Sequence, residues 1–257
     1  MTLASRLSTQ TNMGMLCDKS SALNAILGNF ALTQCQAIVV GFLASMGALV
    51  LELVGDGEID YKNAIVLIVG SMSTASFASL ALAGLMMCVI ILSKKLKINP
   101  DNIATPIAAS LGDLVTLTIL SFFCTFLYYI KHFIWIHVFI FMLFIILIPV
   151  FAYYSYKNEF VKDALYNGWI PIILAMLISS TGGWIMGYAV DLYTDIAVFQ
   201  PVVNGVGGNL VAIFASRLST VLHQTSEIGV KAEWAPKKWY KYPFDTFFSK
   251  KSKSLRY

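Results

Sequence analysis

The sequence contains the stretch Phe133-Ile-Trp-Ile-His-Val-Phe-Ile-Phe-Met-Leu-Phe-Ile-Ile-Leu-Ile-Pro-Val-Phe-Ala-Tyr153, which holds no Asp, Glu, Lys or Arg. An α-helix crosses the hydrocarbon core of a bilayer in about 20 residues. Inside lipid the backbone polar groups must be satisfied within the segment, and a helix does this. The stretch therefore predicts a transmembrane helix.

Five more apolar segments flank this one. They cover residues 30–54, 64–92, 103–130, 169–190 and 196–213. The last is interrupted by Pro201 and several glycines, which predicts a broken or unwound helix. Such a break frees carbonyl groups that can line an ion path. The alternative is a kink with tight helix packing.

Composition agrees with a membrane bundle. Of the 257 residues, 58% are hydrophobic and only 12% are charged, against about 25% charged in soluble domains. The net charge of +4 comes largely from the C-terminal tail, so no nucleic acid partner is expected. The four cysteines show no paired spacing, and the chain carries no phosphate loop or nucleophile–base pair. The class predicted is an all-α polytopic membrane helix bundle, not an enzyme.

Basic residues orient the chain. If residues 1–29 are cytoplasmic, sixteen of the eighteen Lys and Arg fall on the cytoplasmic side, eight of them in the tail. The opposite side holds only Lys62 and Lys131, together with six Asp and Glu residues. Because cytoplasmic loops are enriched in Lys and Arg, this pattern supports six spans with residues 1–29 and the tail in the cytoplasm.

A long-period repeat divides the chain. Ala4-Ser-Arg-Leu-Ser-Thr9 recurs as Ala215-Ser-Arg-Leu-Ser-Thr220, displaced by 211 residues. Six predicted spans lie between the copies, so both have the same orientation in the membrane. We therefore expect parallel internal repeats related by an axis along the membrane normal. The arginine of each copy lies at a cytoplasmic helix end, where it snorkels, caps carbonyls or repels cations; a structural role is favoured.

One carboxylate lies inside a predicted span. Asp113 follows the string Asn99-Pro-Asp-Asn-Ile-Ala-Thr-Pro-Ile-Ala-Ala-Ser-Leu-Gly and lies about 15 Å along the third span at 1.5 Å per residue. A charge there costs roughly 2.5–3.5 kcal/mol, and no Lys or Arg lies within a span to pair with it. A bound cation would supply the missing charge. The alternative is a protonated Asp that is hydrogen-bonded across helices. Asn204 and Asn209 of the last segment add neutral oxygens.

These strings resemble the solute carrier 41 family, the animal relatives of the bacterial MgtE magnesium channels. The resemblance runs from residue 1 to about residue 222 and is carried by Asn99–Asp113, Asn204–Ala212 and Ala215–Thr220. It implies an MgtE-like transporter of magnesium or other divalent cations, with Mg²⁺ as transported substrate and no cofactor. Its partners would be the magnesium ion and the lipid bilayer, and the weakly preferred location is the plasma membrane.

The resemblance also implies site residues. Asp113 matches the pore-lining aspartate that helps to hold the ion, and Ala109 matches a pore-lining carbonyl one turn earlier. Gly208 and Asn209 match a glycine-asparagine motif.

The same resemblance implies a division of the chain. Residues 1–130 form a first repeat whose start is missing, 131–168 a linking helix and loop, 169–222 the start of a second repeat, and 223–257 a basic aromatic tail. The counterparts of the glycine-asparagine motif and of Asp113 would fall outside the chain. We therefore expect a truncated chain that needs a second copy or the missing half. Two alternatives are a non-transporting or inactive membrane subunit and a proton-coupled solute carrier.

Overall fold

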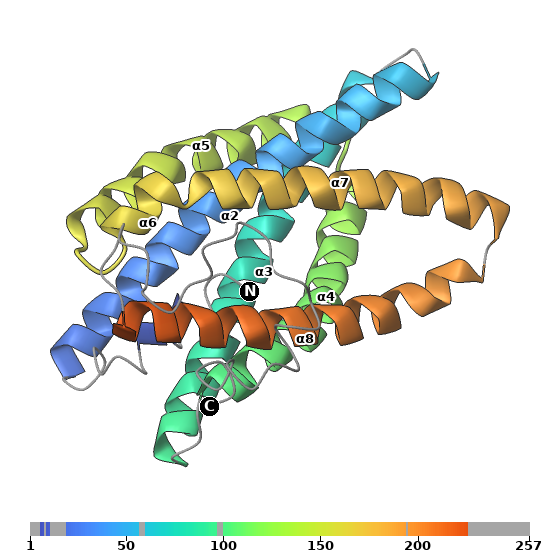
Figure 1. The fold of residues 1–257 in the computed structure, drawn as a ribbon. Helices are drawn as coiled ribbons and strands as arrows, with labels where there is room; N and C mark the ends of the chain where they lie inside the picture. The colour runs from blue at the N-terminus through green and yellow to red at the C-terminus, as the bar shows by residue number, and fades with distance from the viewer. Residues whose placement is uncertain are drawn as a thin grey trace.

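The computed structural model describes residues 6–7, 9–10, 19–56, 60–96, 100–193 and 195–225. Seven helices follow the short helical residues near the N-terminus: α2 (Lys19–Asp56), α3 (Tyr61–Lys95), α4 (Pro100–Tyr129), α5 (Ile134–Lys157), α6 (Lys162–Asn167), α7 (Trp169–Leu192) and α8 (Ile196–Thr225). The described residues include no strand. The all-α prediction is confirmed (Figure 1).

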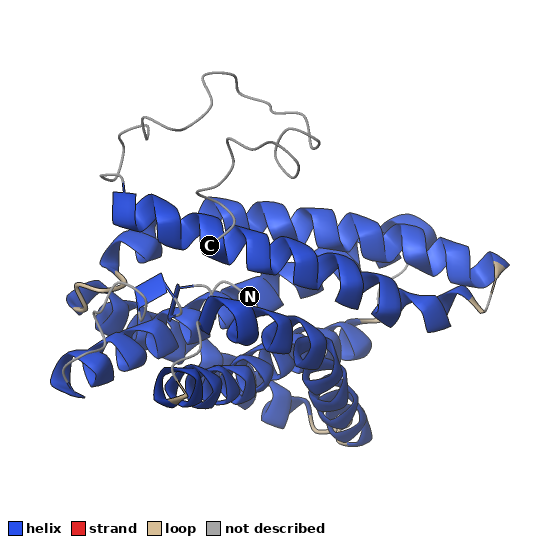
Figure 2. Ribbon diagram, turned by 60° about the horizontal axis from the view of Figure 1, so that its bottom comes forward, coloured by secondary structure: helices blue, strands red, loops and turns tan. Residues whose placement is uncertain are grey.

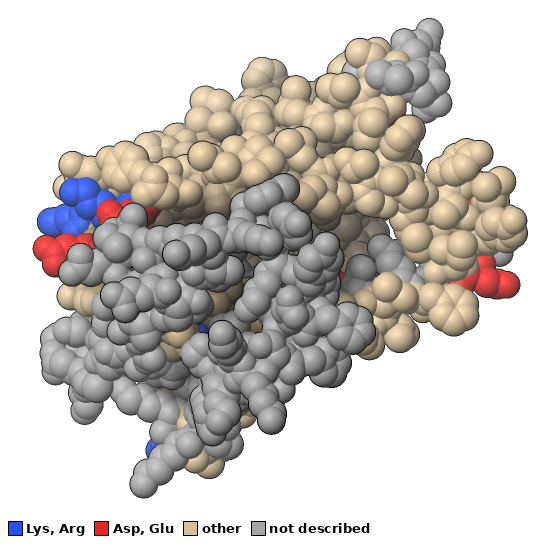
Figure 3. Space-filling view, in the orientation of Figure 1, with Lys and Arg blue, Asp and Glu red and all other residues tan. Residues whose placement is uncertain are grey.

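Six of the described helices are long and apolar enough to cross a membrane, namely all except α6. Their outward faces carry many large apolar side chains, and Trp135 on α5 is 87% exposed. An exposed apolar surface of this extent indicates contact with lipid. Figure 3 shows a wide uncharged surface between the end of the molecule at the α5–α6 turn and the acidic turn between α7 and α8. These observations confirm a multi-pass membrane protein.

Helices α2 to α5 form the packed part of the molecule. Helix α2 packs against α3 and α5, and α3 packs against α4. One buried cluster joins Ile38 of α2, Met72 of α3 and Phe144 of α5, and another joins Val69 of α3 to Leu127 of α4. Helices α2 and α3 form the centre of this bundle and carry most of its buried residues.

Polar groups and a glycine hold α2 against α3. The side-chain amide of Gln34 donates to the hydroxyl of Ser79 at 2.9 Å, and the hydroxyl of Ser76 donates to the amide oxygen of Gln34 at 2.8 Å. A Cβ atom on Gly41 would lie 3.0 Å from the Cβ of Ala75. Because lipid is as apolar as a helix surface, close approach of small residues and hydrogen bonds between helices are what hold such pairs together.

Helices α7 and α8 are joined by a short turn and form a layer along one side of the α2–α5 bundle (Figure 2). No residue of α7 is buried. Helix α8 packs mainly against α4 and much less against α7. The two helices are therefore attached to the bundle chiefly through α4.

The predicted break in the last span is wrong. Helix α8 is one continuous helix from Ile196 to Thr225 and includes Pro201 and the glycines that follow. A break exposes backbone groups that lipid cannot satisfy, so a glycine-rich segment stays helical there unless protein or water takes up the freed groups. Pro201 is the sixth residue of α8, so it removes one backbone hydrogen bond of the helix without ending it. Because the helix is continuous, the free carbonyl groups that a break would expose are also absent from the described part of α8.

Candidate functional site

Asp113 lies on α4, and α4 begins at Pro100. Proline at the first position of a helix loses no hydrogen bond, because that N–H has no intrahelical acceptor. Thirteen residues at 1.5 Å each put Asp113 about 20 Å from the start of α4. The Asp113 side chain is exposed, while Leu111 and Gly112 beside it are half-buried. The helix therefore presents this carboxylate away from the packed core.

Asn209 lies on α8 and is half-buried. Its side-chain oxygen Oδ1 is buried and has no hydrogen-bond partner among the described residues. Leaving a buried acceptor unpaired costs about 1–3 kcal/mol. A cation or a water bound to a cation would satisfy this oxygen. Gly208, which precedes it, is half-buried, and Gly205 and Gly207 face open space.

The two predicted site helices pack together, since α4 and α8 are neighbours in the structure. The fold therefore places the helix of Asp113 beside the helix of the unpaired Asn209 oxygen. The described residues hold no group of three or more His, Cys, Asp or Glu that could bind a metal. A site here would use one carboxylate, neutral oxygens and retained water, and Mg²⁺ often binds in that way.

Two predicted site residues are only partly described. The backbone of Ala109 and of Asn204 lies within α4 and α8 respectively, but both side chains lie outside the described residues. In a regular helix the carbonyl of Ala109 accepts the N–H of Asp113. The second lone pair of that carbonyl remains available to a ligand. The tail from residue 226 onward also lies outside the described residues.

The repeated segments meet in space. The hydroxyl oxygens of Thr9 and Thr220 lie 3.4 Å apart, and both residues are buried. These residues end the two copies of the repeat, so their separation of 211 residues equals the displacement of the copies. This contact was not predicted from the sequence. The repeat offset was the signal that could have suggested it, although an offset alone does not predict proximity.

Arg6 of the first copy is largely enclosed. Its Nε and one terminal nitrogen are buried without a hydrogen-bond partner among the described residues. Burial lowers the pKa of Arg6 to about 10, because desolvation disfavours the charged guanidinium. The side chain therefore stays charged at neutral pH. Its equivalent, Arg217, is half-buried on α8.

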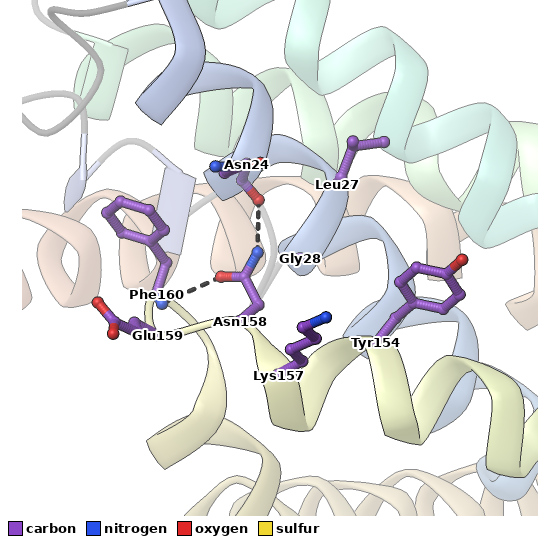
Figure 4. A pocket seen from close by; sticks show the side chains of 8 residues that line it. All are labelled: Asn24, Leu27, Gly28, Tyr154, Lys157, Asn158, Glu159 and Phe160. Atoms are coloured by element: carbon purple, nitrogen blue, oxygen red, sulfur yellow. Dashed lines mark hydrogen bonds between the residues drawn. The ribbon is translucent and has the colours of Figure 1, made fainter.

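A cavity of about 440 Å³ lies elsewhere, between the start of α2 and the end of α5. Asn158 lines this cavity (Figure 4). Its amide nitrogen donates to the carbonyl oxygen of Asn24 at 2.7 Å, and its amide oxygen accepts the N–H of Phe160 at 3.0 Å. These bonds tie the α5–α6 connection to α2. The cavity contains neither Asp113 nor Asn209.

Residues 1–123 match the model of the MgtE family, which is described as a divalent cation transporter. Solute carrier family 41 member 2 of Homo sapiens is 45% identical over 251 residues, which are 96% of this chain and 44% of that protein. Solute carrier family 41 member 3 of Rattus norvegicus is 43% identical over 257 residues, 99% of this chain and 55% of that protein.

The chain thus spans about half the length of the curated relatives that it matches. No solved structure matches it. The match to the rat protein covers 99% of this chain and so includes α4 and α8. The chain belongs to the solute carrier 41 family.

Proposed function

We propose that this chain takes part in the transport of magnesium or other divalent cations across a membrane, with Asp113 as the carboxylate that holds the ion. The observation that carries the proposal is the packing of α4 against α8. It brings the helix of an exposed carboxylate beside the helix of Asn209, whose buried oxygen has no hydrogen-bond partner among the described residues. Both groups gain from a cation with bound water.

The electrostatics favour a strongly hydrated ion. An isolated carboxylate at membrane depth costs roughly 2.5–3.5 kcal/mol, and a cation offsets that cost. Magnesium dehydrates reluctantly and often binds through one or two carboxylates. A calcium cage takes six to eight oxygen ligands directly on the ion. One Asp with Asn209 and backbone carbonyls suits magnesium better.

The proposal extends to location and partners. The family's printed names describe solute carriers, and the matched family model is described as a divalent cation transporter. We place the chain in the plasma membrane, with residues 1–29 and the tail from residue 223 in the cytoplasm, as the distribution of Lys and Arg favours. A second copy or a further segment that supplies another carboxylate would complete the site.

Magnesium influx into proteoliposomes that contain the purified 257-residue chain tests this function. Asp113→Asn keeps the shape of the side chain and removes its charge. Loss of one charge-assisted contact of about 1.5–3 kcal/mol predicts a reduction in flux of roughly ten- to a hundredfold. The matched control is Asp191→Asn, which neutralises an exposed carboxylate at the end of α7 and should leave flux unchanged.

Other outcomes identify other functions. Equal flux in Asp113→Asn and the parent chain would overturn the assignment of Asp113. Absence of magnesium flux from the parent would reject transport by this chain alone. Flux of an organic solute that follows a pH gradient without magnesium would identify a proton-coupled carrier instead.

A further inference from the structure

Thr9 and Thr220 occupy the same position in the two copies of the repeat, and their hydroxyl oxygens lie 3.4 Å apart. Thr9 is 4% exposed and Thr220 is 8% exposed. In a twofold arrangement, contacts across the axis generally join different residues of the two halves. Two equivalent residues contact each other only if they lie beside the axis. An axis that related the two repeats would therefore pass between these hydroxyls.

A second observation agrees with this axis. Ile107 of α4 packs against the buried cluster that contains Leu7 of the first copy. Helix α4 also packs along α8, which carries the second copy. Helix α4 is therefore flanked by both copies, as expected of helices arranged around the axis.

The threonine contact is at one end of the proposed cation path, the route between α4 and α8. From Asn209 to Thr220 helix α8 advances by eleven residues, about 16 Å. It runs from the acidic α7–α8 turn toward the end of the molecule that contains the α5–α6 connection (Figure 1). That end carries Lys157 and Lys162 and is cytoplasmic under the proposed orientation.

The separation of the two hydroxyl oxygens is too short for an ion to pass between them. Magnesium binds oxygen at 2.0–2.1 Å, so two oxygens on opposite sides of a bare ion are about 4.2 Å apart. An ion that keeps its water needs a wider opening still. At 3.4 Å the hydroxyls contact each other directly and leave no room between them.

We propose that Thr9 and Thr220 form the cytoplasmic constriction of the cation path and must separate before an ion can cross. This inference rests on the proposed transport function and adds two residues to it. A hydroxyl pair suits such a role, because it holds a closed state by one hydrogen bond and offers two oxygens to water when it opens.

The arginines of the repeat strengthen the closure. Arg6 and Arg217 each precede a threonine of the pair by three residues, which places each Arg and its Thr on one helix face. Arg6 is charged at neutral pH although it is largely enclosed. A positive charge one turn from the contact opposes a divalent cation while the constriction is closed and dry.

A cysteine pair tests the constriction. The background is the full chain with Cys17, Cys35, Cys88 and Cys124 replaced by serine. In this background Thr9→Cys and Thr220→Cys are combined, reconstituted and treated with an oxidant or a reductant. Mass spectrometry of linked peptides measures the cross-link, and magnesium influx is measured on the same vesicles. We expect a cross-link in high yield, a fall in flux of about tenfold or more on oxidation, and recovery on reduction.

Each single-cysteine variant is a control and should respond to neither treatment. Absence of the cross-link would overturn the contact, and a cross-link that leaves flux unchanged would overturn its role as the constriction. Absence of flux from the cysteine-free parent would reject the proposed function and the constriction with it, whereas the cross-link yield reports on the axis independently.

Thr9→Val provides a second readout if the double variant is inactive when reduced. It keeps the side-chain volume and removes the hydroxyl, so the closed state loses one hydrogen bond. Basal flux should rise roughly two- to tenfold. Thr118→Val, on an exposed hydroxyl of α4 that bonds only to its own helix, is the matched control and should not change flux. Unchanged flux in Thr9→Val would contradict the proposal.

Discussion

His137 of α5 holds the end of α4 through the carbonyl oxygen of Leu127, which lies 3.1 Å from ring atom Nε2. The other ring nitrogen, Nδ1, lies 3.2 Å from the carbonyl oxygen of Phe133. His137 is 1% exposed. Leu127 is in the last turn of α4, where carbonyl groups lack intrahelical partners. In the tautomer that carries its proton on Nε2, the imidazole donates to the carbonyl of Leu127 and satisfies this helix end.

His137→Leu should destabilise the protein by about 1–3 kcal/mol, because it leaves the carbonyl of Leu127 buried without a donor. Thermal unfolding of the detergent-solubilised chain measures the effect as a lower Tm. His132→Leu is the matched control, since His132 is an exposed histidine in the same connection. Equal Tm values for the two variants would show that the Leu127 contact does not hold α4.

The close approach of α2 and α3 depends on Gly41. A Cβ atom there would lie 3.0 Å from the carbonyl oxygen of Ser71 and 3.2 Å from the Cα of Met72, both of which belong to the backbone of α3. Gly41→Ala must therefore separate two helices, at a cost of about 1–3 kcal/mol. Gly47→Ala is the control, because Gly47 is on the same helix and faces open space. Tm should fall in the first variant and not in the second.

Asn158 and Gly28 should behave as a coupled pair. A Cβ on Gly28 would lie 2.5 Å from the side-chain amide of Asn158, so Gly28→Ala displaces the amide that bonds to Asn24. Each of Gly28→Ala and Asn158→Ala should cost about 1–3 kcal/mol. Their effects should not add, since without the amide the added methyl group has room. Additive losses in a double-mutant cycle would contradict this coupling.

Asn209 should affect transport through its oxygen. Asn209→Leu removes the buried unpaired oxygen and should lower magnesium flux roughly three- to tenfold, as the loss of one neutral hydrogen bond predicts. Asn167→Leu, on an exposed residue at the end of α6, is the control. Dependence of flux on magnesium concentration separates weaker binding from slower turnover. Full flux in Asn209→Leu would remove this residue from the site.

Much of the architecture was predictable from local sequence. The apolar stretch Phe133–Tyr153 forms most of α5, and the apolar segment 103–130 lies almost wholly within α4. Such predictions succeed because the bilayer sets helix length and forces the backbone to bond within each segment. The predicted break at Pro201 was wrong because, within a bilayer, the backbone must form its hydrogen bonds inside the segment. Glycine and proline would favour a break in water, but the membrane environment favours a continuous α8.

The sequence by itself predicted the apolar helices, showed which loops are basic, placed Asp113 within an apolar segment, and revealed that one segment occurs twice. Only the tertiary structure decided that α4 lies against α8, that His137 caps α4, and that Thr9 meets Thr220. The physical reason is the solvent. Lipid is as apolar as a helix interface, so a face that packs and a face that meets lipid look alike along the sequence. Close helix approach and buried hydrogen bonds decide which face packs and which face meets lipid. Both kinds of contact exist only after the helices have packed.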